Sequence, residues 1–195
     1  MSQSRKQAIL EGVERQRRRN RLVSLSAIVI VAIVVVAVVI ALPRSSSAVP
    51  LPGYLDRCIS SAIYHAHLGL TIVANGSSVV IPASTGIQGA CNKPIHTHDT
   101  SGTLHIETDE NRQYFLHDFF LIWGNQENNP ERAIFNSTQL FGGHVVTGQH
   151  SLTMTVNDAS NSDFQNFAIP KNSQTASDVC SQTPCVTTNV VITYT

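Results

Sequence analysis

The sequence predicts a mainly β protein: a small antiparallel barrel or sandwich with one or two short helices, plus one N-terminal transmembrane helix. Two observations favour β-structure, namely several stretches in which apolar and polar residues alternate and the turn residues that follow them. A third observation, an uncharged apolar run at residues 22–42, predicts the transmembrane helix. The 195 residues are enough for one ordinary domain with an appendage.

The N-terminal segments predict a membrane anchor. Residues 1–21 form a basic tail with seven of the 13 basic residues and only two of the 13 acidic ones. Residues 22–42 carry no charge, and a helix that rises about 1.5 Å per residue crosses the roughly 30 Å hydrocarbon layer over this length. The basic tail favours a cytoplasmic N-terminus, which puts the following domain outside the cell membrane. A cleaved signal peptide is the main alternative, although its apolar region is usually only about 7–15 residues long.

The rest of the chain predicts a linker at residues 43–53, rich in proline and serine, and an extracytoplasmic β domain at residues 54–195. Its four cysteines are an even number in an oxidising compartment, which favours two disulfide bonds. Three connectivities are open, of which we favour Cys58–Cys91 as the first pair. The second pair, Cys180–Cys185, then closes only a small loop. The domain is acidic on balance, so it offers no basic surface for nucleic acid.

A β-hairpin is expected between residues 95 and 107. Two alternating runs flank Asp99-Thr100-Ser101-Gly102, which is typical turn chemistry. With Thr100 and Ser101 as the loop, His96 lies opposite His105, and burial of the apolar face opposes a shift by one residue. One face then carries Ile95, Thr97, Leu104 and Ile106. The other face carries His96, His98, His105 and Glu107.

An upstream stretch, residues 63–74, alternates in the same way and places His65 and His67 on its polar face. Asn75-Gly76 follows, which is the strongest short hairpin signal. The expected cross-strand pairs are Ala74 with Ser77, Ile72 with Val79, and Leu70 with Ile81. If the two hairpins lie side by side, five histidines and one glutamate can converge.

Four further elements are expected downstream. Residues 114–124 are rich in aromatic side chains and predict a short core helix that Asp118 caps and that ends at Gly124. Residues 144–157 alternate, with Leu152, Met154 and Val156 on one face, and predict a strand. Residues 190–194 predict a closing strand, and one more short strand is expected at residues 167–169.

The motif residues also resemble a known group of proteins. Between Cys58 and Gly124 the chain reads Cys-x6-His-x-His, then His-Thr-His-Asp-x-Ser-Gly-x-x-His-x-Glu, then Phe-Phe-x-Ile-Trp-Gly. This pattern resembles uncharacterised bacterial and archaeal proteins that are membrane-anchored or secreted. The resemblance implies a shared ectodomain, and it brings no established activity with it.

The histidine face predicts a metal site. Imidazole and carboxylate are ligands for Cu(II), Zn(II), Ni(II) and Fe(II), and outside the membrane copper or zinc is our first choice. The expected ligands are His65, His67, His96, His98, His105 and Glu107, and Asp99 is expected to orient an imidazole through its other ring nitrogen. A hydrogen-bonded histidine–aspartate network and a proton-sensing cluster are the alternatives.

Three functions are compatible with these residues. The first is a membrane-tethered module that stores, delivers or senses copper or zinc, which would imply a metalloprotein partner. The second is an enzyme whose His/Glu site holds a metal with an open position. The third is a metal-free cell-surface structural or interaction domain. The chain contains no Gly-x-Ser-x-Gly, no His-Glu-x-x-His and no phosphate-binding glycine loop, so the common hydrolase, metalloprotease and nucleotide-binding motifs do not apply.

Overall fold

The computed structural model describes residues 16–17, 33, 49–170 and 188–195, and the account below concerns the unit that begins at Ser46. No helix in these described ranges is long and apolar enough to cross a membrane. The predicted span at residues 22–42 lies outside the described residues, apart from Ile33, and so do Cys180 and Cys185. The anchor and the second disulfide therefore stay predictions.

The described chain is mainly β with one α-helix and several sheets, which confirms the predicted class. The strands that form the largest sheet are β1 (Tyr64–Ala74), β2 (Ser77–Ser78), β5 (Ile95–His96), β6 (Thr103–Thr108), β10 (Leu152–Val156), β11 (Ala159–Ser160) and β12 (Asn189–Tyr194). The smaller sheets contain β3 (Ile87–Gln88), β4 (Cys91–Asn92), β7 (Phe135–Asn136), β8 (Gln139–Leu140) and β9 (His144–Val145). The helices are α2 (Leu116–Gln126) and the short 3-10 helix η1 (Phe164–Asn166).

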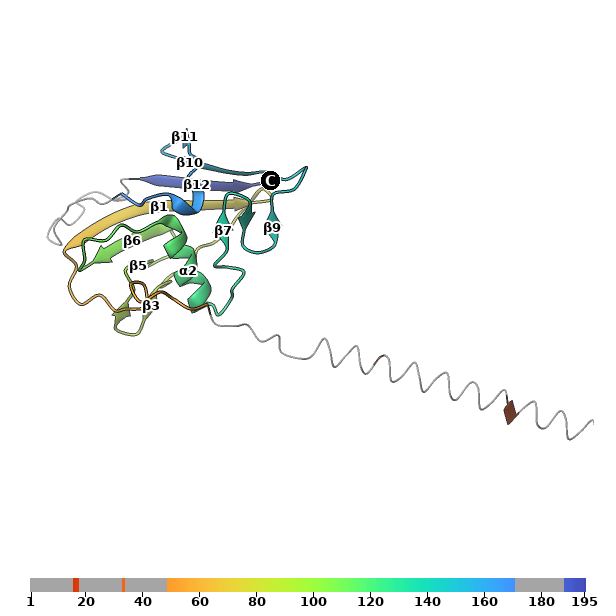
Figure 1. The fold of residues 1–195 in the computed structure, drawn as a ribbon, viewed down its shortest axis with the longest axis horizontal. Helices are drawn as coiled ribbons and strands as arrows, with labels where there is room; N and C mark the ends of the chain where they lie inside the picture. Colours follow the sequence, from red (N-terminus) through yellow and green to blue (C-terminus); the bar gives the residue numbers. More distant parts are fainter. Residues whose placement is uncertain (1–15, 18–32, 34–48, 171–187) are drawn as a thin grey trace, which may run out of the picture. The chain divides into compact units, whose positions relative to one another are not determined.

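The seven-stranded sheet is open rather than a closed barrel, with the order β11-β10-β12-β1-β6-β5 and β2 paired to β1. Figure 1 shows β1, the longest strand, running between β12 and β6. The pairing of β1 with β12 is parallel, whereas the other pairs in this sheet are antiparallel. The sheet is therefore mostly antiparallel with one parallel pair, and of the two predicted architectures the closed barrel is wrong for the described strands.

The predicted hairpin between residues 95 and 107 is confirmed. His96 pairs with His105 and Ile95 pairs with Ile106, as the loop at Thr100 and Ser101 requires. The Asn75 turn is also confirmed, because Ala74 pairs with Ser77 and Asn75 and Gly76 both have positive φ. Gly adopts this backbone conformation without steric cost, and Asn at a lower cost than most residues, which explains the turn.

The predicted pairing of Leu70 with Ile81, in the hairpin that turns at Asn75, is wrong, since β2 ends at Ser78. The Val79 N–H still donates to the Ile72 carbonyl at 2.8 Å. The backbone of Leu70, the next residue of β1 on this edge, is hydrogen-bonded to a different segment. The Leu70 N–H donates to the Gly102 carbonyl at 2.9 Å, where β6 begins. One edge of β1 thus pairs with β2 near its C-terminal end and with β6 along the rest. The segment that leads into β6 occupies the position where Ile81 would have paired with Leu70.

One face of the sheet is the core. Alternate residues of β1 and β6 point into it, and α2 covers it with its buried aromatic side chains. The largest fully buried members are Leu68, Ile72, Leu104, Phe119, Phe120 and Trp123. The predicted aromatic core helix is thus confirmed, although Phe115 is 38% exposed.

The start of α2 differs in detail from the prediction. Phe115 is the N-cap residue, and Asp118 lies at the third helical position rather than at the cap. The Asp118 carboxylate accepts the Phe115 N–H at 2.9 Å, so it satisfies a donor at the helix start from inside the first turn. The helix ends at Gln126, two residues later than expected.

A disulfide bond joins Cys58 to Cys91 with a sequence separation of 33, as predicted. It ties the segment before β1 to β4 and so fixes one end of the loop that leads into β5. We expect the double variant C58S/C91S to lower the free energy of unfolding by about 3–4 kcal/mol, because a cross-link over such a loop restricts the unfolded chain. Chemical denaturation of both proteins measures the difference, and equal stabilities would contradict it.

Candidate metal site

Three adjacent strands of the sheet supply the histidine cluster. β1 contributes His65 and His67, β6 contributes His105, and β5 with the residue pair after it contributes His96 and His98. The register sets His67 opposite His105 and His105 opposite His96. Because neighbouring strands lie about 4.8 Å apart, these imidazoles stand in a row across the sheet on the side opposite the core. The predicted convergence of two His-x-His stretches is therefore seen in the backbone itself.

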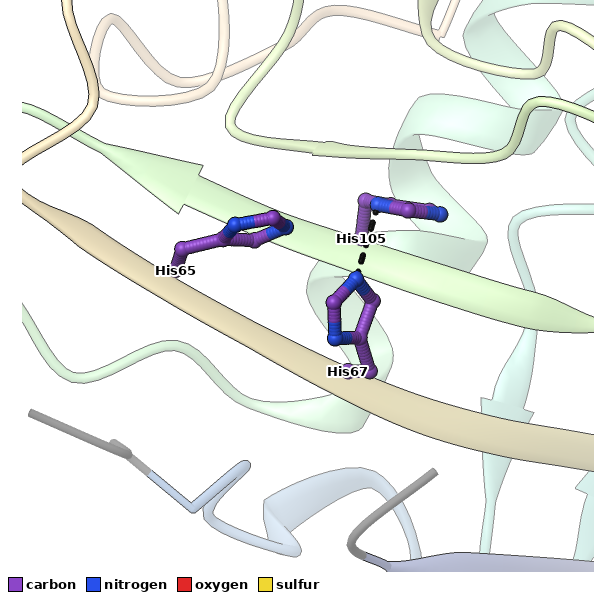
Figure 2. A group of neighbouring side chains, drawn as sticks. All are labelled: His65, His67 and His105. Atoms are coloured by element: carbon purple, nitrogen blue, oxygen red, sulfur yellow. Dashed lines mark hydrogen bonds between the residues drawn. The ribbon is translucent and has the colours of Figure 1, made fainter. Parts of the chain in front are cut away.

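The ring nitrogens form two groups of three that share His105. In the first group, nitrogens of His65, His67 and His105 all lie within 4.8 Å of one another. Figure 2 shows His65 and His67 rising from one strand toward His105 on the next. The second group is His96, His98 and His105, within the same limit. Ligand nitrogens bound to one ion at about 2.0–2.1 Å are at most about 4.2 Å apart, so small side-chain rotations suffice for binding.

His96 is the most strongly constrained member of the cluster. It is fully buried, although its register placed it on the polar face. Its Nδ1 lies 2.9 Å from the Lys93 carbonyl oxygen, and since a carbonyl only accepts, Nδ1 carries the proton and donates it. Nε2 is then the unprotonated nitrogen, and it is buried without a hydrogen-bond partner among the described residues. A backbone carbonyl that fixes the tautomer in this way is the usual support of a metal-binding histidine.

The loop that contains Gly86 covers His96. An added Cβ at Gly86 would lie 2.5 Å from the Ile95 oxygen and 3.1 Å from the His96 Cβ. The Lys93 N–H donates to the Gly86 carbonyl at 2.8 Å, and the Thr97 N–H donates to the Thr85 carbonyl at 2.9 Å. This cover could not be predicted from the sequence, because its only local signal is one glycine in a short loop before a predicted strand.

The two acidic residues of the predicted site behave differently. Glu107 pairs with His65 across β1 and β6, and its Oε1 lies 3.5 Å from the His65 Nε2. That distance is too long for a good hydrogen bond, and His65 Nε2 is accordingly without such a partner among the described residues. Asp99 instead accepts the Ser101 N–H at 2.8 Å in the exposed turn. The hydrogen bond that orients an imidazole comes from Lys93, not from the predicted Asp99.

Burial and mutual repulsion favour the uncharged form of three of these histidines, because they lower the pKa of His67, His96 and His105. Burial, with the neighbouring imidazoles adding to it, lowers the pKa of His105 to about 3. Burial and then His65 lower the pKa of His67, and burial lowers the pKa of His96 although its hydrogen bond to the Lys93 carbonyl opposes the shift. Neutral imidazole is the form that binds metal ions, so these three side chains are ready for coordination at neutral pH.

The same shifts predict that the metal-free protein loses stability in mild acid. In the unfolded chain the three histidines regain a pKa near 6.5, so below this pH the unfolded state binds more protons than the folded state. The free energy of unfolding therefore keeps its full value above about pH 6.5 and decreases as the pH falls below it, because protons bind preferentially to the unfolded chain. Denaturation in the presence of a chelator should show a lower free energy of unfolding at pH 5 than at pH 7.5. The variant H105Q should show a smaller difference, and an equal difference would contradict the assignment.

The remaining described histidines lie outside the cluster. His117 is 41% exposed at its side chain and lies beside Asp118 on α2. His144 and His150 both contact the Tyr194 ring, with centroid distances of 4.9 and 5.5 Å. These three residues are natural controls for any experiment on the cluster.

The site and the sheet together define a histidine-rich candidate metal centre on an open, mainly β scaffold. Comparisons with protein-family models, with curated proteins and with solved structures find no match for this chain. The resemblance to uncharacterised membrane-anchored or secreted proteins accordingly stays a prediction. A function can therefore be argued only from the geometry of the site itself.

Proposed function

We propose that this protein is a membrane-tethered, extracytoplasmic metal-binding module that holds copper or zinc on its histidine face. The ligands are drawn from His65, His67, His96, His98, His105 and Glu107. The single observation that supports this most strongly is the Nε2 of His96. A buried nitrogen without a partner costs about 1–3 kcal/mol, and a metal ion removes that cost.

The chemistry of the donors supports copper or zinc. Imidazole nitrogen suits Zn(II) and Cu(II), whereas thiolate sulfur would favour Cu(I). Both cysteines in the described part of the chain are joined to each other in a disulfide, so they offer no thiolate to this site. Burial lowers the pKa of His67, His96 and His105, and the Glu107 carboxylate lies beside His65, so a divalent cation can bind here without placing like charges together.

Metal analysis of the full-length chain tests this proposal. The purified protein is treated with a chelator, dialysed, titrated with CuCl2 or ZnCl2, and its bound metal is measured by elemental analysis. We expect at least one tightly bound ion per chain, and the same content in the H117A variant. A chain that holds no stoichiometric metal would instead favour the metal-free structural or interaction domain.

A metal-dependent enzyme is the second candidate, and the placement of Glu107 favours it. Its side chain is 24% exposed beside His65, so solvent reaches this end of the cluster. A metal ion held there would activate water, and a nearby carboxylate could accept a proton from it. Azide or cyanide binding to the Cu(II)-loaded protein would reveal an exchangeable position and favour the enzyme. A closed site without exchange favours storage, delivery or sensing, for which a metalloprotein partner is expected.

The location outside the membrane rests on the sequence alone. The basic tail at residues 1–21 and the apolar run at residues 22–42 support an anchor with a cytoplasmic N-terminus. Protease added to intact cells should then cleave within residues 50–195 and leave the tail intact. Cleavage of the tail would reverse the orientation, and a mature protein that begins near Val49 would mean a signal peptide.

A further inference from the structure

The histidine cluster is split into two halves by its central strand. β6 lies between β1 and β5 in the sheet, so β1 and β5 are about 10 Å apart. His65 and His67 therefore approach His105 from one side, and His96 and His98 approach it from the other. The two groups of three nitrogens have only His105 in common. Because each group of three can bind an ion separately, the five histidines provide two ion positions with His105 between them.

The orientation of the His105 ring suits a shared ligand. Its Nδ1 lies 3.1 Å from the His67 Nε2, a hydrogen bond in which one ring donates and the other accepts. Figure 2 shows the second nitrogen of His105 at the end of the ring that is turned away from His65 and His67. The flanking rings of His67 and His98 both meet His105 edge-on, each with a centroid distance of 4.4 Å and interplanar angles of 86° and 81°.

Resting on the proposed metal-binding function, we infer that the cluster binds two divalent ions and that the His105 imidazole bridges them. One ion is bound by His65, His67 and the Nδ1 of His105, and the Glu107 carboxylate lies beside His65 as a further candidate ligand. The other takes His96, His98 and the Nε2 of His105. A bridging imidazole uses both ring nitrogens, so the one ring proton of neutral His105 leaves to solvent when the second ion binds, and the ring becomes an imidazolate. No electron is transferred in this step.

The two halves are built differently, which indicates that the bridge joins two unlike positions. His96 is fully buried and held by Lys93, and the loop of Gly86 lies against it. His65 is partly exposed beside the Glu107 carboxylate. The half that contains His96 therefore offers a fixed neutral ligand, whereas the half that contains His65 offers an added negative charge and access to solvent. Charge from Glu107 and from the imidazolate offsets part of the four positive charges of two ions.

Titration of the full-length chain with CuCl2 tests the bridge. We expect two Cu(II) ions per chain, and we expect the electron paramagnetic resonance signal of the first ion to weaken when the second binds, since an imidazolate couples the two spins. The H98A variant should bind one ion with an undiminished signal, and so should H67A. His98 is exposed, so its replacement leaves the core intact. The triple variant H117A/H144A/H150A should still bind two coupled ions.

The outcomes separate this inference from the proposed function. Two ions per chain with full, additive signals would overturn the bridge. One ion in the parent chain, with full affinity, would overturn the two-ion arrangement and leave the metal-binding function standing. Two ions that persist in H98A and H67A would place the second ion outside the cluster and overturn the inference. Only a chain that binds no copper and no zinc would remove the proposed function itself.

Discussion

Replacement of His96 by alanine should weaken the binding of Cu(II) or Zn(II) at its half of the cluster by more than about 100-fold. Loss of a hydrogen-bonding partner behind a ligand already costs roughly 10–100-fold in metal affinity, and His96 is argued to be the ligand itself. Its tautomer is fixed by the Lys93 carbonyl, and its Nε2 has no other partner in the described structure. Competition titration with a chelating indicator dye measures the change. An affinity within a few-fold of the parent chain would contradict the assignment.

Stability measurements distinguish a lost ligand from a damaged fold. In the metal-free protein, alanine at position 96 removes packing but also removes a buried unsatisfied nitrogen, and these two effects oppose each other. For the ion held by His96, free metal at 100 times its dissociation constant in the parent chain stabilises the parent by about 2.7 kcal/mol and the variant by at most about 0.4 kcal/mol. The matched control is H117A, whose histidine lies outside the cluster and which should keep the full gain. An equal loss in the presence and absence of metal would indicate a structural role.

The strand register of the site could be predicted because successive side chains of a strand point to opposite faces and the apolar face must be buried. Ile95 and Ile106 must both enter the core, and an even loop then fixes His96 opposite His105. The same argument placed His65 and His67 on the polar face of their strand, since β1 buries Ala66 and Leu68 on the other face. Alternation did not predict that β1 lies beside β6. Short-range alternation was sufficient in these places because each residue's face is decided within a few positions of the chain.

The remaining features depend on contacts between distant segments. The parallel pairing of β1 with β12 joins residues more than a hundred positions apart, and no local pattern distinguishes it from an antiparallel pair. The stop after Ser78 arises because β6 occupies the same edge of β1. The burial of His96 arises because a separate loop covers it. In each case the deciding partner lies far away in the sequence, where alternation carries no information.

The Gly86→Ala variant should lower the free energy of unfolding by about 2–4 kcal/mol and weaken metal binding at the same time. Gly86 has a φ of +80°, which costs about 1–2 kcal/mol for a residue with a Cβ. The added Cβ would also lie 2.5 Å from the Ile95 oxygen, a backbone atom that cannot rotate away. Relief of this clash must move the loop or β5. Because β5 carries His96 and the loop covers it, either movement displaces a proposed ligand.

Gly89→Ala is the matched control for this prediction. Gly89 has a φ of +60°, so it carries a similar conformational cost, but no atom lies within 4 Å of an added Cβ. We expect Gly89→Ala to cost only about 1–2 kcal/mol and to leave metal affinity unchanged. The difference between the two variants in chemical denaturation isolates the clash, and the difference in metal titration isolates the displacement of His96. Equal effects in both experiments would show that backbone conformation alone accounts for the loss. They would also show that the loop of Gly86 does not hold His96 in place.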